Sequence, residues 1–379
     1  MKIVNIVGAR PNFMKIAPIM EAYRSVPELT PILVHTGQHY DERMSDLFFR
    51  QLGIPRPDIN LGVGSGSHAT QTAEIMKAFE RVVLEEEPDA LLVVGDVNST
   101  IACGLVAVKL GVPLIHVEAG LRSGDRSMPE EINRILTDAI TDLFFCTEQG
   151  AIDNLVREGH DPSRIHFVGN VMIDTLLKNL DRARQSTILD DLSLDERGYA
   201  VLTLHRPSNV DNHATLTGLL DSVEEIQRDL PVVFPIHPRT RARLAENGLG
   251  ARMEAMPGLR VIDPVGYLDF LRILAGARVV LTDSGGIQEE TTILKVPCLT
   301  LRENTERPIT VQAGSNQIVG TCPERILQAY RSLPADSGST CGTPPLWDGS
   351  AATRIVRIIA DTYCPGSAEA EPAAASKPS

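Results

Sequence analysis

Short apolar runs alternate with longer amphipathic segments along most of this chain. In the first half, runs rich in Val, Ile and Leu predict buried strands over 2–8, 31–37, 90–96, 113–120 and 143–147. Between them, apolar residues recur at helical spacing and predict helices over 14–25, 70–87, 99–110 and 129–141. Regular alternation of strands and helices is typical of parallel sheets with helices on both faces.

The same alternation begins again near residue 199, where a second set of strands is predicted over 199–205, 231–237, 259–264, 278–284 and 296–301. A polar, helix-like stretch separates the two sets. The pattern therefore predicts an α/β protein with two doubly wound, Rossmann-like domains in tandem. We place the N-terminal domain at 1–170, a linker at 171–195, the C-terminal domain at 196–345, a C-terminal helix at 346–364 and a disordered tail at 365–379.

The C-terminal helix and the predicted disordered tail differ in their sequence patterns. Ile355, Ile358 and Ile359 fall on one face of a helix expected over 350–363. The residues after Cys364 are rich in Pro, Ala and Ser and offer little apolar surface to bury, so we expect disorder there.

Composition narrows the possible partners and the compartment. The 379 residues suit two domains, and the net charge of −13 disfavours binding to nucleic acid or to an anionic membrane. The six cysteines include no C-x-x-C pair, which argues against a zinc site and a disulfide framework. No apolar stretch approaches the ~20 residues of a membrane helix, and the start lacks the apolar region of a signal peptide. We therefore expect a cytoplasmic protein.

Polar residues follow several of the predicted strands. In open α/β sheets, ligands bind at the carboxyl ends of strands. Six such ends carry acidic, histidine, lysine or arginine side chains, with the groups Arg10 and Lys15; Asp96; His116, Glu118 and Arg122; His205 and Arg206; His237 and Arg239; and Asp283 with Ser284. This distribution predicts a binding cleft between the two domains.

The stretch "VVLTDSGGIQEE" (279–290) ends a strand and opens a helix. Ser284, Gly285 and Gly286 leave the backbone amides of the helix start unobstructed, which suits a phosphate. Glu290 lies about one and a half turns further on, where a carboxylate can bind a ribose diol. The stretch is equally compatible with a plain helix capped by Asp283 or Ser284.

Two other motifs carry less chemistry. The glycine-rich segment 62–66 does not follow a predicted strand and lacks Rossmann spacing, so we interpret it as a loop, and no Walker loop is present. His35, His39, His116 and His237 lie on different predicted elements without the spacing of a metal site, so no metal is expected.

Seven segments together closely resemble the non-hydrolysing UDP-N-acetylglucosamine 2-epimerases. They are "GARPNFMK" (8–15), "GD" (95–96), "HVEAGLRSGDRSMPEEINR" (116–134), "GNVMIDTL" (169–176), "LHRPSNVD" (204–211), "TDSGGIQEE" (282–290) and "RENTERP" (302–308). The resemblance extends in order from residue 1 to about 360. It implies a glycosyltransferase-B fold with a UDP-sugar in the interdomain cleft, and a homodimer.

The resemblance also implies a reaction without a redox cofactor. The enzyme would interconvert UDP-GlcNAc and UDP-ManNAc by eliminating UDP to a 2-acetamidoglucal and adding it back, for surface polysaccharide precursors. Asp96, Glu118 and Glu130 match the family's active-site carboxylates, and proton transfer at C2 requires such groups. Clustered carboxylates also raise one another's pKa, which helps one of them to hold a proton.

The remaining site residues are likewise matched to the family. His205, Arg10 and Arg307 would balance the charge of the departing UDP. Lys15 and Arg134 match active-site positions, and Phe270 matches a position near uracil. Ser284, Gly285, Gly286 and Glu290 match the diphosphate and ribose contacts.

Taken without the resemblance, several of these residues have plainer explanations. Glu130 would be an acid in the first turn of a helix, Phe270 a core residue and His205 a packed strand-end histidine. Lys15 and Arg134 would be solvated helix charges.

Several features leave alternatives open. Asn12 and Ser208 stand where many relatives carry an acid or amide, and "QHYDERM" does not match the glutamine-rich segment of the family's allosteric site. The segment 36–53 resembles the subset acting on decorated UDP-sugars such as UDP-2,3-diacetamido-glucuronate. The alternatives are therefore a decorated-sugar epimerase, a hydrolysing relative, and a catalytically silent sugar-nucleotide-binding regulator.

Overall fold

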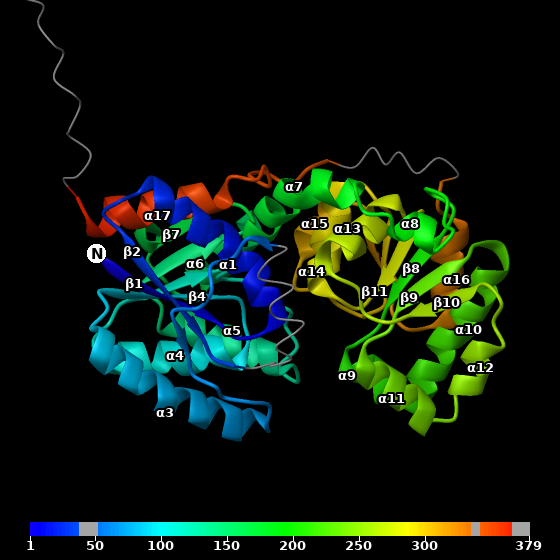
Figure 1. Ribbon diagram of the computed structural model, residues 1–379, viewed down its shortest axis with the longest axis horizontal. Helices are drawn as coiled ribbons and strands as arrows, with labels where there is room; N and C mark the ends of the chain where they lie inside the picture. The colour runs from blue at the N-terminus through cyan, green and yellow to red at the C-terminus, as the bar shows by residue number, and fades with distance from the viewer. Residues whose placement is uncertain (38–51, 335–341, 366–379) are drawn as a thin grey trace, which may run out of the picture.

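The computed structural model describes residues 1–37, 52–334 and 342–365, and these form two parallel sheets lying side by side (Figure 1). The first sheet has the order β3-β2-β1-β4-β5-β6-β7. Its strands are β1 (Lys2–Val7), β2 (Thr30–His35), β3 (Ile59–Asn60), β4 (Ala90–Val94), β5 (Leu114–Val117), β6 (Leu143–Cys146) and β7 (Ile165–Phe167). The second sheet has the order β10-β9-β8-β11-β12-β13. Its strands are β8 (Ala200–Thr203), β9 (Val232–Pro235), β10 (Leu259–Ile262), β11 (Val279–Thr282), β12 (Cys298–Thr300) and β13 (Asn316–Ile318).

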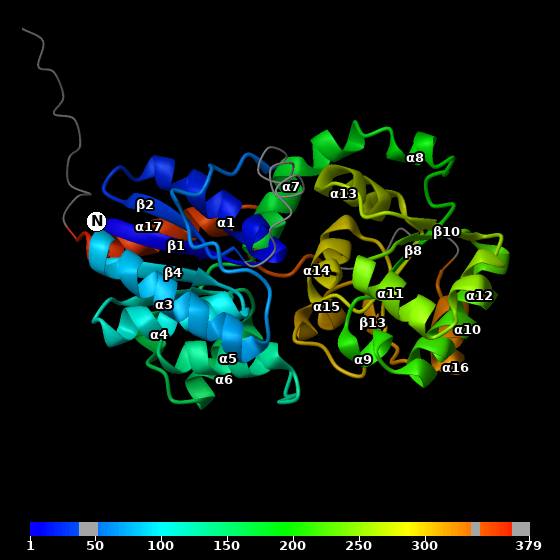
Figure 2. The same ribbon diagram turned by 60° about the horizontal axis from the view of Figure 1, so that its bottom comes forward.

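Helices connect the strands and cover both faces of each sheet (Figures 1 and 2). Those of the first half are α1 (Arg10–Ala22), α3 (His68–Glu86), α4 (Asn98–Lys109), α5 (Pro129–Ala139), α6 (Gln149–Arg157) and α7 (Val171–Arg184). Those of the second half are α9 (Pro207–Val210), α10 (His213–Asp229), α11 (Pro238–Glu246), α12 (Gly250–Glu254), α13 (Tyr267–Gly276), α14 (Gly285–Leu294), α15 (Pro308–Gln312), α16 (Pro323–Arg331) and α17 (Ala351–Tyr363). The short helix α8 (Ile188–Asp191) also lies on the second half, where it contacts α13 (Figure 1).

The predicted α/β fold is confirmed, with every predicted strand present. All observed pairs are parallel, for example Val93 with His116 and Val280 with Cys298. Three strands were not predicted, β3, β7 and β13, and each has only two or three residues. Such short strands show no period-2 pattern to detect. Because every strand of a parallel sheet points the same way, the polar residues that follow β1, β4 and β5 gather at one edge.

Helices α7 and α17 join the two halves. Helix α7 occupies most of the predicted linker 171–195 and contacts α1 and α17 on one side and α13 and α14 on the other. Helix α17 returns from the second half to pack against α1, and Figure 2 shows the two helices side by side. Its Ile355, Val356 and Ile359 belong to the same apolar cluster as Ile3 of β1.

Polar contacts fix this return of the chain. The backbone amides of Ala351 and Ala352 donate to the carboxylate of Asp174 in α7, at 3.1 and 2.7 Å. The buried Trp347 donates its indole N–H to the carbonyl of Thr147 at 2.9 Å. The first half is therefore completed by residues from the end of the chain.

Two further sequence predictions concern membranes and thiols. None of the described helices combines the length and apolar character needed to cross a membrane. The cysteines in the described part of the chain, Cys103, Cys146, Cys298, Cys322 and Cys364, are free thiols. The predicted tail, apart from its first residue Pro365, lies outside the described residues.

Candidate active site

A cavity of about 310 Å³ lies between the two halves. Helices α1 and α7 supply one wall, and the strand ends and helices α13 and α14 of the second half supply the other. Six of the predicted site residues line it, namely Lys15, Phe270, Ser284, Gly286, Glu290 and Arg307. The predicted interdomain cleft thus coincides with a cavity that holds groups from both halves.

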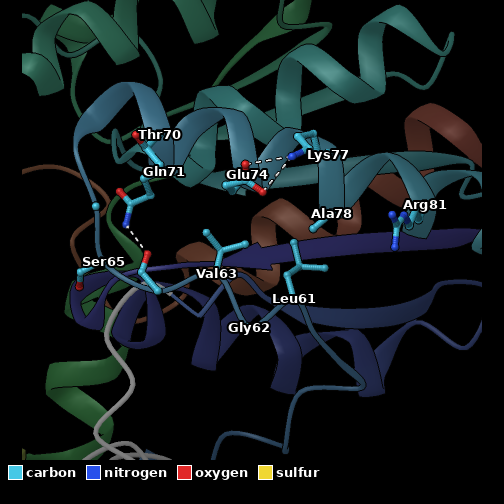
Figure 3. Close-up of a pocket in the computed structure, with 12 residues that line it drawn as sticks. Leu61, Gly62, Val63, Ser65, Thr70, Gln71, Glu74, Lys77, Ala78 and Arg81 are labelled. Atoms are coloured by element: carbon cyan, nitrogen blue, oxygen red, sulfur yellow. Dashed lines mark hydrogen bonds and ion pairs between the residues drawn. The ribbon is translucent and has the colours of Figure 1, made fainter.

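A larger hollow of about 460 Å³ lies elsewhere, between the glycine-rich loop 62–66 and α3 (Figure 3). The segment 62–66 is a loop, as predicted. Glu74 and Lys77 pair at 2.9 Å on its wall, and Gln71 donates to the Gly64 carbonyl at 3.4 Å. No predicted site residue lines this hollow, so we take the interdomain cleft as the candidate site.

The turn after β4 places Asp96 near Arg134 and Lys15; Lys15 lines the cavity, and Asp96 does not. Gly95 has a φ of +68°, and a Cβ there would lie 2.9 Å from the Lys15 ammonium nitrogen, so the position favours glycine. Asp96 accepts a hydrogen bond from Arg134 at 2.5 Å. Burial acts to raise the pKa of Asp96, but the charges of Arg134 and Lys15 outweigh it and lower the pKa. Asp96 is therefore ionised and held in place.

The turn after β5 carries Glu118, which has an unusual backbone conformation. Its φ is +69°, in the left-handed region that costs a non-glycine residue roughly 1 kcal/mol or more. Glu118 is buried and accepts a short hydrogen bond from Lys15, and its carboxylate lies 3.7 Å from Arg307 of the other half. Its Oε1 is buried and has no hydrogen-bond partner among the described residues.

Helix α5 carries the third predicted carboxylate. Glu130 stands in the first turn, directly after Pro129, as its plainer explanation requires. Its side chain is 41% exposed and lies 3.9 Å from Arg206 of the second half. Arg134, one turn further along, is buried and reaches Asp96, so it is not a solvated charge.

Glu131, next to Glu130, was not predicted as a site residue. It is buried and accepts the backbone amides of Ser123 and Gly124 at 3.0 Å each, and it pairs with Arg134. These bonds hold the loop that follows Glu118. Two adjacent acids in one helical turn give no sequence signal as to which is buried.

The second half presents His205 at the end of β8. Its Nδ1 lies 2.8 Å from the carboxylate of Asp283, and the ring is about half exposed. Asp283 also accepts the backbone amides of His205 and Arg206. Burial acts to raise the pKa of Asp283, but His205 and these amides lower it. Asp283 therefore orients His205 rather than capping α14.

The start of α14 is free of a side-chain cap. Ser284 occupies the N-cap position without a capping side-chain bond, and Gly285 and Gly286 open the helix. The capped-helix explanation is thus not what the structure shows. Glu290 is buried, lines the cleft, and accepts a hydrogen bond from the Tyr267 hydroxyl at 3.5 Å. Phe270 lines the cleft while packing partly against a core cluster.

Arg307 connects the two halves. It is buried, its Nε donates to Glu289 at 2.5 Å, and its Nη1 has no hydrogen-bond partner among the described residues. Burial acts to lower the pKa of Arg307, but the charges of Glu289 and Glu118 raise it above its ordinary value. Arg307 is thus a fixed cation with donor capacity left over.

Two buried carboxyls beside Arg307 were not predicted. Burial raises the pKa of Glu289 to about 7, against the opposing charge of Arg307. Burial likewise raises the pKa of Glu148 to about 7, although Arg307 and a hydrogen bond from the Ile309 amide oppose it. Glu148 belongs to the first half and Ile309 to the second, so this bond crosses the boundary. Glu148 lies in none of the seven family-like segments, and Glu289 lies in the segment 282–290, whose sequence does not show that this carboxyl is buried.

Several predicted site residues do not themselves line the cavity, namely Asp96, Glu118, Glu130, Arg134, His205 and Gly285. Other predicted features lie outside the described residues. The side chain of Arg10 is not described; the residue begins α1. Gly285 faces Glu306 rather than the cavity. Asn12 is buried and donates to the Val94 carbonyl at 2.8 Å, while Ser208 is exposed in α9. Residues 38–51, which include His39 and the "QHYDERM" segment, lie outside the described residues.

The other histidines considered for metal binding lie apart on β2, β5 and the turn before α11. His116 is buried between Asp138 and the Gly95 carbonyl. Across the described ranges, no group of three or more His, Cys, Asp or Glu residues is arranged to hold a metal ion.

Comparison with known proteins places this geometry among sugar-nucleotide epimerases. Residues 21–360 match the model of the UDP-N-acetylglucosamine 2-epimerase family. The chain is 42% identical over 365 residues to the UDP-N-acetylglucosamine 2-epimerase of Methanocaldococcus jannaschii, covering 95% of this chain and 99% of that protein. It is also 42% identical over 367 residues to the UDP-2,3-diacetamido-2,3-dideoxy-D-glucuronate 2-epimerase of Pseudomonas aeruginosa, covering 95% and 99%.

Solved structures of proteins from the same family have a similar fold. The M. jannaschii enzyme in complex with UDP-GlcNAc and UDP superposes with a TM-score of 0.89 at 43% identity, covering 95% of this chain and 99% of that one. The predicted arrangement of two doubly wound domains as in the glycosyltransferase-B fold is confirmed by this neighbour and by the sheet topology.

Proposed function

Because this chain belongs to the UDP-N-acetylglucosamine 2-epimerase family, we propose that it interconverts UDP-GlcNAc and UDP-ManNAc in the cleft between its two sheets. One observation carries the proposal: Glu118 of the first half lies 3.7 Å from Arg307 of the second. A base for the sugar and a cation for the diphosphate thus meet at one place, as an elimination across C1 and C2 requires.

In this proposal the second half holds the nucleotide. The unobstructed start of α14 takes the diphosphate, since exposed amides and the helix dipole both favour anions. Glu290 binds the ribose hydroxyls from about one and a half turns deeper in the same helix. Phe270, which lines the cavity, provides an aromatic face for uracil.

The first half carries out the proton chemistry. One carboxylate removes the C2 proton while the C1–O bond breaks, which leaves a 2-acetamidoglucal and UDP. UDP then adds back to C1 as a proton is delivered to the opposite face of C2, so atoms and charge balance over the cycle. Asp96, Glu118 and Glu130 are the candidates for these transfers. The lowered pKa of Asp96 keeps it ionised and able to accept a proton.

Side chains of both halves stabilise the departing UDP. Arg307 keeps an N–H group without a partner among the described residues, and His205 is held at the end of β8 by Asp283. We assign Arg10 to the same group because it begins α1 at the cleft edge. Lys15 and Arg134 orient Glu118 and Asp96 by direct ion pairs. The chemistry needs no redox cofactor, since the sugar ends at its original oxidation state.

A second candidate substrate has support of its own. The P. aeruginosa relative named as a UDP-2,3-diacetamido-2,3-dideoxy-D-glucuronate 2-epimerase is as similar in identity as the M. jannaschii enzyme. The same elimination at C2 would serve a sugar with an acetamido group at C3 and a carboxylate at C6. Either product would enter the synthesis of surface polysaccharide precursors.

Incubation of the purified protein with UDP-GlcNAc in D2O, followed by NMR, tests the proposal. We expect UDP-ManNAc to appear with deuterium at C2. No conversion and no exchange would contradict the proposed reaction and leave the silent regulator. Turnover of the diacetamido-glucuronate alone would establish the second candidate. Free N-acetylmannosamine with UDP would identify a hydrolysing enzyme.

Two remaining expectations are part of the proposal. The family resemblance implies a homodimer, which light scattering of the eluted protein tests directly. The expected cytoplasmic location is tested by fractionating cells that express the full chain. A monomer, or recovery outside the cytoplasmic fraction, would contradict the respective expectation.

A further inference from the structure

A buried pair, His116 and Asp138, lies behind the two carboxylate-bearing turns. His116 is the third residue of β5, and Asp138 is near the end of α5; both side chains are fully buried. Neither residue lines the cavity or belongs to the sugar-binding residues assigned above. A charged pair in the interior is costly unless its hydrogen bonds are satisfied, so its presence needs an explanation.

The ring of His116 faces an acceptor at each nitrogen. Its Nε2 lies 2.9 Å from the carbonyl oxygen of Gly95, and its Nδ1 lies 2.7 Å from Oδ1 of Asp138. A carbonyl oxygen can only accept. A neutral imidazole has one N–H group and could satisfy only one of these partners. Both contacts are satisfied when the ring is an imidazolium that donates at both nitrogens.

The carboxylate of Asp138 extends the arrangement to the second turn. Its Oδ2 accepts the backbone amide of Gly120 at 3.0 Å and lies 2.7 Å from Arg122. Burial acts to raise the pKa of Asp138, but His116 and Arg122 lower it, so the group is ionised. Arg122 in turn pairs with Glu158 at 2.6 Å, so the positive and negative charges of the group balance.

These bonds therefore join the two turns that carry Asp96 and Glu118. Gly95, held by His116, directly precedes Asp96. Gly120, held by Asp138, lies two residues after Glu118, whose left-handed backbone needs such support. The two turns also share a backbone bond, from the Gly95 amide to the Val117 carbonyl at 3.0 Å.

We propose that doubly protonated His116 and Asp138 are positioning residues for the epimerisation, because they fix the separation of Asp96 and Glu118. The inference rests on the proposed function. Helix α5 supports both carboxylates, since its Arg134 contacts Asp96 and its Asp138 lies one turn further along. An inversion at C2 needs two groups at a fixed relative position, and a displacement of about 1 Å can cost about 10²-fold in rate.

The variants His116→Gln and Asp138→Asn test this. The side-chain amide introduced by His116→Gln can donate to only one of the two acceptors, the Gly95 carbonyl or Asp138. Its own oxygen then faces the other acceptor, and no hydrogen bond forms there. The NH2 group introduced by Asp138→Asn would face donors in either orientation: the Gly120 N–H and Arg122 at the Oδ2 position, or the Nδ1–H of His116 at the Oδ1 position. We expect kcat to fall about 10²-fold while the Kd for UDP, measured by calorimetry, is unchanged. Free 2-acetamidoglucal should also accumulate, because delivery of the second proton is delayed.

Asp142→Asn is the matched control. Asp142 accepts the Leu114 amide at 2.9 Å at the amino end of the same strand β5, away from both turns. It should lower thermal stability without lowering kcat. If His116→Gln and Asp138→Asn reduce kcat no more than this control does at equal loss of stability, the positioning role is wrong.

NMR of the wild-type protein with 15N-labelled histidine gives an independent result. At neutral pH, we expect signals from His116 that show a proton on both Nδ1 and Nε2. The loss of these signals in His116→Gln assigns them to His116. If that variant does not fold, through-bond correlation of the ring nitrogens with the backbone of residue 116 makes the assignment. A single protonated nitrogen would overturn the two-donor arrangement. This result stands even if the wild type fails to epimerise UDP-GlcNAc, in which case only the proposed function falls.

Discussion

The two edges of the cleft are built in opposite ways. On the first half, side chains carry the chemistry: Asp96 and Glu118 lie on turns with positive φ, held by Lys15 and Arg134. On the second half, the backbone is exposed at the start of α14, and the cation Arg307 stands beside it. The first half thus presents charged side chains at fixed positions, and the second half presents backbone amides without side-chain caps at the start of α14.

This difference separates two requirements of the proposed reaction. Proton transfer needs carboxylates at fixed positions, and strain such as that at Glu118 persists only where surrounding bonds enforce it. Nucleotide binding needs an anion site, which a helix start supplies without side chains. Substitutions on the first half should therefore change the rate, and substitutions on the second half should change affinity.

The largest expected effect is on the first half. Asp96→Asn, Glu118→Gln and Glu130→Gln should each lower kcat by about two or more orders of magnitude, the usual contribution of a general acid or base. C2–H exchange in D2O should be lost as well, while UDP still binds. Glu74→Gln, an exposed carboxylate on α3, is the control. Near-normal rates for all three would place the chemistry elsewhere.

The next effect is on the second half. Arg307→Lys keeps the charge but loses the fork that contacts Glu289 and Glu118 together. We expect UDP affinity to fall about 30-fold, which corresponds to about 2 kcal/mol. Calorimetry measures this, with Arg325→Lys as a control because Arg325 is exposed and paired with Glu303. Unchanged UDP affinity with a lowered kcat would contradict the division between the edges.

A smaller effect concerns the boundary, where Glu148 of the first half accepts the Ile309 amide of the second. Its folded pKa of about 7 lies above its ordinary value. Between those values the unfolded chain loses the proton while the folded one keeps it, so stability falls as pH rises. Glu148→Gln should remove a contribution of about 1.4 kcal/mol per pH unit within that window.

Urea unfolding at several pH values between about 5 and 7 measures that slope. The variant should keep part of the dependence, because Glu289 also has a raised pKa of about 7. If the free energy of unfolding depends on pH equally in the variant and the wild type, Glu148 is ionised throughout this range. The described role of its carboxyl between the two halves would then be wrong.

The smallest effect compares two neighbouring glycines. A Cβ at Gly285 would lie 2.5 Å from Glu306 Oε1, whereas one at Gly286 would lie 3.8 Å from Met172 Cε. Gly285→Ala should therefore destabilise the fold by about 1 kcal/mol, and Gly286→Ala should stabilise it by about 0.5 kcal/mol. If the diphosphate binds at this helix start, Gly286→Ala should still weaken UDP binding. Thermal unfolding and calorimetry separate the two effects.

The alternation of strands and helices could be predicted because buried parallel strands are continuous apolar runs, as in Ala90–Val94. The strands β3, β7 and β13 could not, because pairing with a neighbour, rather than their own two or three residues, makes them strands. The return of α17 to the first half was also not predicted. An amphipathic pattern shows that a helix has a partner but not which one.

The candidate site shows the same limit. The positions of Lys15 and Arg134 came from motif resemblance, and sequence alone favoured solvated charges; both are buried. Glu131 and Glu289 lie within family-like segments and Glu148 in none, but the burial of all three could not be predicted because it arises only when distant segments meet. Glu130 and Glu131 illustrate this: they are adjacent acids, one 41% exposed and the other buried.

The return of α17 has a consequence for biosynthesis. The apolar cluster around β1 includes Ile355 and Ile359, which are among the last described residues to be made. During translation, the first half of the protein therefore leaves the ribosome before its packing partner α17 has been made. That half thus lacks one of its packing partners until the second half and then α17 have been translated.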